Sequence, residues 1–150
     1  RFRLETFTVC DSAAAKNKSY PHGTPLRDSD TANKLARGIY STLDADKEHF
    51  VMFTLNNKNR ITGFKIISTG SMTASLVHPR EVFTAALELR AAALVFVHNH
   101  PSGDPTPSPE DITLTRRLKE CAELLGLRAL DHIIIGDEGK FFSFTDKGML

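Results

Sequence analysis

Two short apolar runs with a helical segment between them constrain the fold of this chain more than any other feature. The runs are "ALVFVHNH" at residues 93–100 and "ALDHIIIG" at residues 129–136, and a strand that is buried on both faces has this largely apolar character. Between them, apolar residues recur with a helical period from Pro109 to Gly126, and glycine is a common helix terminator. Strand, helix and strand in this order predict an α/β architecture.

The segment before the first run adds a helix and a hairpin to this prediction. A helix is expected to run to residue 43 with Leu35, Ile39 and Leu43 on its apolar face, and its cap is one of Asp28, Ser29 and Asp30. Residues 48–55 and 60–68 are rich in β-branched and aromatic side chains and flank the turn "NNKN", so they predict a β-hairpin.

Two further elements complete the predicted fold. A helix is expected from Pro79, and its apolar stripe consists of Val82, Phe83, Ala86 and Leu87. A last strand is expected within "KFFSF" near the C-terminus. We therefore predict an α/β fold in which helices flank a mixed β-sheet, formed by residues 29–150. Residues 1–28 are predicted to be a partly irregular N-terminal arm with a candidate edge strand, "LETFTV".

The helix from Pro109 is expected to have one buried and one solvated face. Arg116, Arg117 and Lys119 are interpreted as part of the solvated face. Cys121 lies on the apolar stripe and is expected to be buried and unreactive. The residues expected to face inward are Ile112, Leu114, Leu118, Cys121, Ala122 and Leu125.

Composition and charge argue against several classes of protein. A chain of 150 residues with 41% apolar residues is long enough for one domain with a core. The net charge of +1 lacks the basic excess of sequence-independent DNA-binding proteins. Cys10 and Cys121 form no CxxC motif, no apolar run is long enough to span a membrane, and the start has no signal-peptide core. These features predict a cytoplasmic protein without a membrane partner.

The segment "HNHPSGDPTPSPED" at residues 98–111 carries the strongest functional signal. Residues two apart on a strand face the same way, so His98 and His100 are expected to lie side by side. Catalytic zinc sites often combine two histidines with one carboxylate and leave a position for water. The third ligand is open among Asp104, Glu110 and Asp111, of which the last two lie at the start of a helix.

A structural role explains part of the same segment. In "SPED", Ser108 is expected to cap the helix, Pro109 to occupy the first turn, and Asp111 to reach back to the cap as in a capping box. That role requires neither the histidines nor the proline-rich path before the helix. The two interpretations compete for Asp111, because a carboxylate that binds a metal is not fully free to reach back to the cap.

The spacing from His98 to Asp111, H-x-H-x7-S-x2-D, matches the signature of JAMM (MPN-plus) metalloproteases, and the segment resembles the RadC-like branch of that family. The resemblance continues through "ISTGSMTASLVHPREVF" and "LGLRALDHIIIGDEGKFFSF", from residue 25 to residue 146. It implies the MPN/JAMM architecture, which is similar to that of cytidine deaminases, with a JAMM/MPN-plus domain over residues 29–150. Full-length RadC proteins also carry a helix-hairpin-helix segment that has no match here, so we expect an isolated catalytic-type domain or a short member of the family.

By this resemblance, His98, His100 and Asp111 bind Zn²⁺, Ser108 lies near the open side of the metal, and Glu48 is the general acid and base. Zinc lowers the pKa of its bound water from about 15.7 to about 7. Glu48 would take the proton of this water, and the Ser108 hydroxyl would stabilise the oxygen of the attacked amide. The implied function is a zinc-dependent metallopeptidase or isopeptidase with a peptide or isopeptide substrate. From the residues alone, Glu48 is better interpreted as a solvated charge at a strand end.

Two other functions follow from the same family. One is a RadC-type protein of DNA repair that acts on or beside DNA, although the net charge of +1 does not favour DNA as a partner. The other is a non-catalytic MPN scaffold, although such relatives typically lose the ligands that are all present here. Outside the signature, His132 is interpreted as a satisfied histidine at a strand start. The alternative is that His132 and Asp131 orient a metal ligand.

Overall fold

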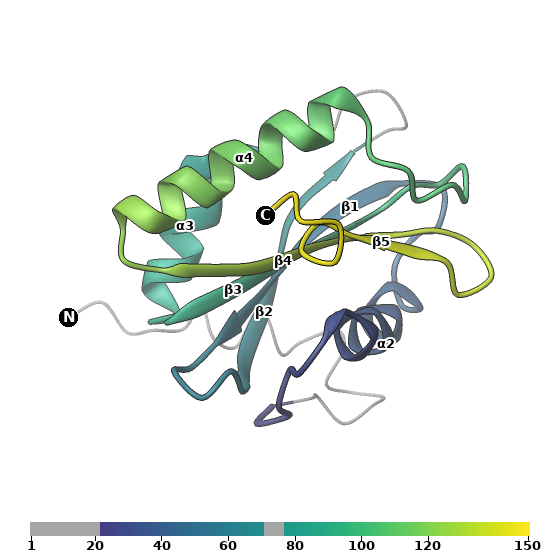
Figure 1. Cartoon of the computed structure of the whole chain (residues 1–150). Helices are drawn as coiled ribbons and strands as arrows, with labels where there is room; N and C mark the ends of the chain where they lie inside the picture. The colour runs from purple at the N-terminus through teal and green to yellow at the C-terminus, as the bar shows by residue number, and fades with distance from the viewer. Residues whose placement is uncertain (1–21, 71–76) are drawn as a thin grey trace.

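The computed structural model describes residues 22–70 and 77–150, which form one mixed sheet with helices on both of its faces (Figure 1). The predicted strand "LETFTV" and Cys10 lie outside these residues. No helix in the described part of the chain has both the length and the apolar character needed to cross a membrane. In chain order the elements are α2 (Ser29–Tyr40), β1 (Glu48–Leu55), β2 (Ile61–Gly70), α3 (Pro79–Glu88), β3 (Ala93–Asn99), α4 (Pro109–Leu124), β4 (Arg128–Ile135) and β5 (Phe141–Ser143).

The sheet has the strand order β2-β1-β3-β4-β5. The hairpin β1–β2 is antiparallel, β1 pairs antiparallel with β3, β3 pairs parallel with β4, and β5 closes the edge antiparallel to β4. The parallel pair is the one joined by a crossover helix, α4, as such a connection requires. The predicted α/β fold with a mixed sheet is therefore confirmed.

Each face of the sheet has its own apolar core. On one face α2 packs with Ala32, Ala36 and Ile39 against residues such as Val51 and Val95. On the other face α3 and α4 cover a second cluster, whose largest members are Phe50, Met52, Phe83, Leu94, Phe96 and Leu118. Figure 1 shows α2 on the opposite side of the sheet from α3 and α4. Because side chains alternate along a strand, β1 and β3 contribute to both cores.

The helix starts follow the predicted caps, whereas some predicted apolar stripes differ. Asp28 is the N-cap of α2, and its carboxylate accepts a hydrogen bond from the backbone N–H of Thr31. Leu87 is 52% exposed, because α3 turns Ala85 rather than Leu87 towards the core. Leu125 is 46% exposed, because α4 ends at Leu124 and Leu125 belongs to the turn that leaves it. Cys121 is only partly buried, so its predicted burial is incomplete.

The alternation along β1 and β3 determines which face carries the histidines. Phe96 of β3 lies in the core under α4, and His98, two residues later, faces the same side. Phe50 of β1 pairs in register with His98. Glu48, two residues before Phe50, therefore starts β1 beside His98. The sheet places these two side chains on the face covered by α4.

Candidate metal centre

Four side chains from separate segments converge at one end of the sheet. Glu48 is the first residue of β1, His98 lies in β3, His100 directly follows β3, and Asp111 lies in the first turn of α4. Each offers one nitrogen or carboxylate oxygen, and these atoms lie within 4.8 Å of one another. The structure thus brings together both predicted histidines, the predicted carboxylate of α4 and the glutamate.

The two histidines face each other as their spacing predicts. Their Nε2 atoms are 3.0 Å apart, and their ring centroids are 4.9 Å apart. Asp111 approaches both rings, with Oδ1 at 3.2 Å from Nε2 of His98 and Oδ2 at 3.1 Å from Nε2 of His100. The other acids considered from the sequence do not join this contact, because the Asp104 carboxylate accepts hydrogen bonds from Thr106 and Glu110 is exposed on α4.

Asp111 completes the capping box and also faces the two histidines, so the cap does not exclude a contact with a metal. The Ser108 hydroxyl oxygen accepts the backbone N–H of Asp111 at 3.1 Å, and Oδ2 of Asp111 accepts the backbone N–H of Ser108 at 2.9 Å, so the capping box is complete. The cap uses only Oδ2, while Oδ1 stays directed at His98. The capping box therefore orients the carboxylate and leaves one of its oxygens available to a metal.

The spacing of these atoms fits a tetrahedral zinc ion. Zinc bonds to nitrogen and oxygen are about 2.0–2.1 Å long, and tetrahedral geometry then separates two ligand atoms by about 3.3–3.4 Å. The two Nε2 atoms are 3.0 Å apart and Oδ1 of Asp111 lies 3.2 Å from Nε2 of His98, whereas the contact of 3.1 Å with Nε2 of His100 is made by Oδ2 of Asp111. Two nitrogens and one carboxylate oxygen are also a common ligand set of catalytic zinc. On geometry and on donor type, the three residues fit this metal.

The surroundings orient the ring of His100 and keep the carboxyl group of Asp111 ionised. Nδ1 of His100 donates to the backbone carbonyl of Asp104 at 2.8 Å, which leaves Nε2 towards the centre. Burial raises the pKa of Asp111, but hydrogen bonds from His100, His98 and the Ser108 N–H outweigh it and hold this pKa well below its ordinary value. The hydrogen bond with Asp111 raises the pKa of His100 against the effect of burial. Asp111 is thus a carboxylate at neutral pH, as a metal ligand must be.

The proline-rich loop between His100 and α4 is packed against the turn between β4 and β5. The N–H of Gly103 donates to the carbonyl of His100, and the carbonyl of Gly103 accepts the N–H of Asp137. Gly103 has φ +85°, which favours glycine, and a Cβ at Gly136 would lie 2.4 Å from the Gly103 carbonyl oxygen. This close backbone contact fixes the path that leads from one histidine to Asp111.

Asn99, between the two histidines, holds the segment that carries Glu48. Its Oδ1 accepts the N–H of His49 at 2.8 Å, and its Nδ2 donates to the carbonyl of Lys47 at 2.9 Å. Both neighbours of Glu48 are therefore bound to β3, and Oε1 of Glu48 lies 3.7 Å from Nε2 of His98. Sequence reasoning missed Asn99, because its contacts are with residues about fifty positions away.

His132 contacts a predicted ligand, which the favoured interpretation did not anticipate. Nε2 of His132 lies 2.8 Å from Nδ1 of His98, and Nδ1 of His132 lies 2.6 Å from the hydroxyl of Thr115. The alternative interpretation, in which His132 orients a ligand, agrees with these contacts. Asp131 has a different role, since its carboxylate accepts hydrogen bonds from Ser143 and Thr145 and the N–H of His132.

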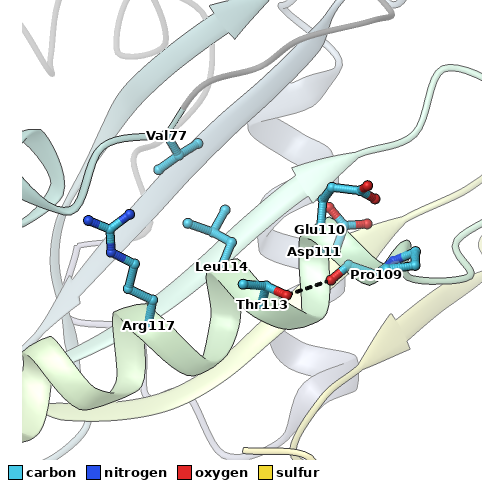
Figure 2. Close-up of a pocket in the computed structure, with 7 residues that line it drawn as sticks. All are labelled: Val77, Pro109, Glu110, Asp111, Thr113, Leu114 and Arg117. Carbon is cyan, nitrogen blue, oxygen red and sulfur yellow. Dashed lines mark hydrogen bonds between the residues drawn. The ribbon is translucent and has the colours of Figure 1, made fainter.

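A groove of about 380 Å³ opens beside the centre along α4. Figure 2 shows Glu110 and Asp111 at one end, Leu114 in the middle and Arg117 at the other end, with Val77 opposite. The hydroxyl of Thr113 donates to the carbonyl of Pro109, which closes the first turn of the helix (Figure 2). The groove therefore connects the centre with a partly apolar surface that ends in a cation.

Comparison with known proteins places the same residues in one family. The family profile described as RadC-like JAB domain matches residues 26–149. A UPF0758 protein of Pelobacter propionicus is 54% identical over 111 residues, which cover 74% of this chain and 48% of that protein. A UPF0758 protein of Geotalea uraniireducens is 58% identical over 107 residues, which cover 71% of this chain and 46% of that protein.

The chain spans about half the length of the curated relatives it matches. The match nevertheless includes every strand and helix of the described structure and all four residues of the candidate metal centre. It also agrees with the mixed sheet and with the fold that the sequence predicted. This protein belongs to the family of RadC-like JAB domains.

Proposed function

We propose that the protein is a zinc-dependent metallopeptidase or isopeptidase that hydrolyses an amide bond. One observation carries this proposal: the Nε2 atoms of His98 and His100 and the carboxylate of Asp111 approach one another to 3.0–3.2 Å, and Glu48 lies beside them. Zinc, when bound, supplies a Lewis acid that lowers the pKa of water and polarises a carbonyl group. His98, His100 and Asp111 are the residues proposed to hold it.

Glu48 is proposed to transfer the proton in this reaction. Its side chain is 20% exposed, so it reaches both the centre and the solvent, and Oε1 lies 3.7 Å from Nε2 of His98. The carboxylate accepts the proton of the attacking water and then donates it to the nitrogen that leaves. General acid–base catalysis of this kind contributes about 10²- to 10⁴-fold to the rate.

Ser108 is proposed to stabilise the negative charge that develops on the carbonyl oxygen. In the capping box its hydroxyl oxygen acts as an acceptor, so the cap does not use the hydroxyl proton. A single donor of this kind contributes about 10²- to 10³-fold to kcat. The hydroxyl thus has one structural and one catalytic partner.

The groove along α4 is proposed to hold the part of the substrate next to the scissile amide. It begins at Asp111 and continues past Leu114 to Arg117. An extended peptide passing along it places a backbone amide over the metal centre and apolar side chains against Leu114 and Val77.

The experiment that tests this function separates metal binding from proton transfer. Zinc content and hydrolysis of a proteome-derived peptide mixture are measured for the wild type, for Glu48→Gln and for the control Asp46→Asn, which removes a nearby exposed charge. We expect one zinc per chain in all three proteins and a loss of about 10²- to 10⁴-fold in hydrolysis only in Glu48→Gln. An active Glu48→Gln protein would remove Glu48 from this role, and a wild-type protein that binds no zinc would end the proposal.

A further inference from the structure

We propose that His132 is a positioning residue that keeps the proton of His98 on Nδ1, so that Nε2 of His98 presents a lone pair to the metal centre. His132 lies outside the H-x-H-x7-S-x2-D spacing, 34 positions after His98 in the sequence. The inference rests on the proposed metal site, and it adds a residue that strengthens metal binding at that site.

Thr115 determines the donor and the acceptor in the hydrogen bonds that lead to His98. Its hydroxyl lies 2.7 Å from the backbone carbonyl oxygen of Asp111. A carbonyl oxygen can only accept, so the hydroxyl is the donor in this hydrogen bond. A threonine hydroxyl has one proton, so towards His132 the same oxygen can only accept. The contact of 2.6 Å between this oxygen and Nδ1 of His132 therefore requires a proton on Nδ1 of His132.

The second step follows from the charge of His132. Its side chain is fully buried, stacks on Phe144 at a centroid distance of 5.0 Å, and meets Phe50 and Phe96 edge-on. A second proton would place a positive charge in a fully buried site among these aromatic rings, which is strongly unfavourable. His132 is therefore a neutral imidazole with one proton, and since that proton is on Nδ1, its Nε2 is an acceptor.

The third step gives the position of the proton on His98, the proposed metal ligand. Nε2 of His132, as an acceptor, receives the proton from Nδ1 of His98 across 2.8 Å. A neutral His98 then carries its lone pair on Nε2, the atom that faces Nε2 of His100 and Oδ1 of Asp111. With the opposite proton order, a proton on Nε2 of His98 would occupy the position of the metal.

The three hydrogen bonds also connect two of the proposed ligands through the protein interior. They run from His98 to His132, from His132 to Thr115, and from Thr115 to the backbone of Asp111. Thr115 is 2% exposed, so none of these bonds competes with bulk water. β3, β4 and α4 are therefore held in register at the centre before any metal binds.

The test measures proton positions and zinc affinity without any substrate. In the full chain with ¹⁵N-labelled histidine, long-range ¹H–¹⁵N spectra of the metal-free protein are expected to show His132 protonated on Nδ1 and bare on Nε2. Zinc affinity, measured by competition with a chromophoric chelator, is expected to fall about 10- to 100-fold in His132→Phe, the range for a lost partner of a ligand. The variant His132→Gln offers an acceptor again and is expected to recover part of this loss.

A matched control distinguishes positioning from packing. Phe144 is fully buried and stacks on His132 but makes no hydrogen bond to it through its ring, so Phe144→Leu is expected to lower the melting temperature and leave zinc affinity within about twofold. Thr115→Val is expected to weaken zinc binding, and Thr115→Ser to restore it, because serine retains the hydroxyl. A proton on Nε2 of His132, or wild-type zinc affinity in a folded His132→Phe protein, would overturn the inference. Peptide hydrolysis has no part in these measurements, so a failure of the proposed function is recognised separately.

Discussion

The two halves of the candidate metal centre are held in different ways. Glu48 and His98 belong to β1 and β3, neighbouring strands in the middle of the sheet, and their positions follow from strand register. His100 and Asp111 lie at the two ends of a loop that leads from β3 to α4, and their positions depend on a few backbone hydrogen bonds and one capping box. We name these the strand half and the loop half.

This difference indicates which part of the candidate metal centre is more sensitive to substitution. A sheet with two covered faces fixes its strands through many contacts, so the strand half tolerates the loss of any one of them. The loop half has fewer contacts, so we expect a single change there to move a ligand. Substitutions that loosen the backbone of the loop half should then act mainly on metal binding, whereas substitutions that loosen the backbone of the strand half should act mainly on catalysis.

Ser108 tests the division between the two halves, because it lies in the loop half and has a proposed catalytic role. Asparagine is also a good N-cap but has no hydroxyl to donate. We expect Ser108→Asn to keep zinc and stability but to lose about 10²- to 10³-fold in kcat. Ser108→Ala should show the same kinetic loss together with about 1 kcal/mol less stability, measured by urea unfolding, because the cap is lost.

Threonine provides the matched control for Ser108, since it retains both the cap and the hydroxyl. Ser108→Thr is expected to stay close to the wild type in kcat and in unfolding free energy. Full turnover in Ser108→Asn would limit Ser108 to the cap and would restore the simple division between the two halves.

Gly136 tests the loop half directly. A Cβ at this position would meet the Gly103 carbonyl oxygen at 2.4 Å and Cδ of Pro105 at 2.7 Å, so Gly136→Ala must displace the loop that leads to Asp111. Overpacking of this kind costs about 1–3 kcal/mol, and we expect zinc affinity to fall by about tenfold or more. Gly38→Ala is the control, because nothing lies within 4 Å of a Cβ there and alanine favours the helix α2. Equal zinc affinity in the two variants would show that the loop half is as robust as the strand half.

The parts of the molecule that the sequence predicted are those determined by local spacing. The period of two in a strand placed His98 and His100 on one side, and the residue types of "SPED" specified the cap of α4. Glu48 was identified only through the resemblance, because it meets His98 through the pairing of β1 with β3 and not through any local pattern.

Long-range register explains the residues that sequence reasoning undervalued. His132 reaches His98 because β4 runs parallel to β3 with an irregularity between Leu94 and Val95 of β3, which no spacing in the sequence announces. The error at Leu87 has a related cause, since the face of α3 that is covered depends on how the helix packs on the sheet, whereas Leu125 is exposed because α4 ends one residue before it.

Asn99 tests the strand half, where we expect the smallest of these effects. Asn99→Ala removes the hydrogen bonds to the N–H of His49 and the carbonyl of Lys47, each worth about 1 kcal/mol. The pairing of β1 with β3 continues at Phe50, so His98 stays in place and zinc affinity is expected to stay within about twofold. Only the end of β1 that carries Glu48 is loosened, and we expect kcat to fall by about tenfold in steady-state kinetics of the zinc-loaded protein. If zinc affinity fell as far as kcat, Asn99 would support the ligands as well as Glu48, and the strand half would depend on single contacts as the loop half does.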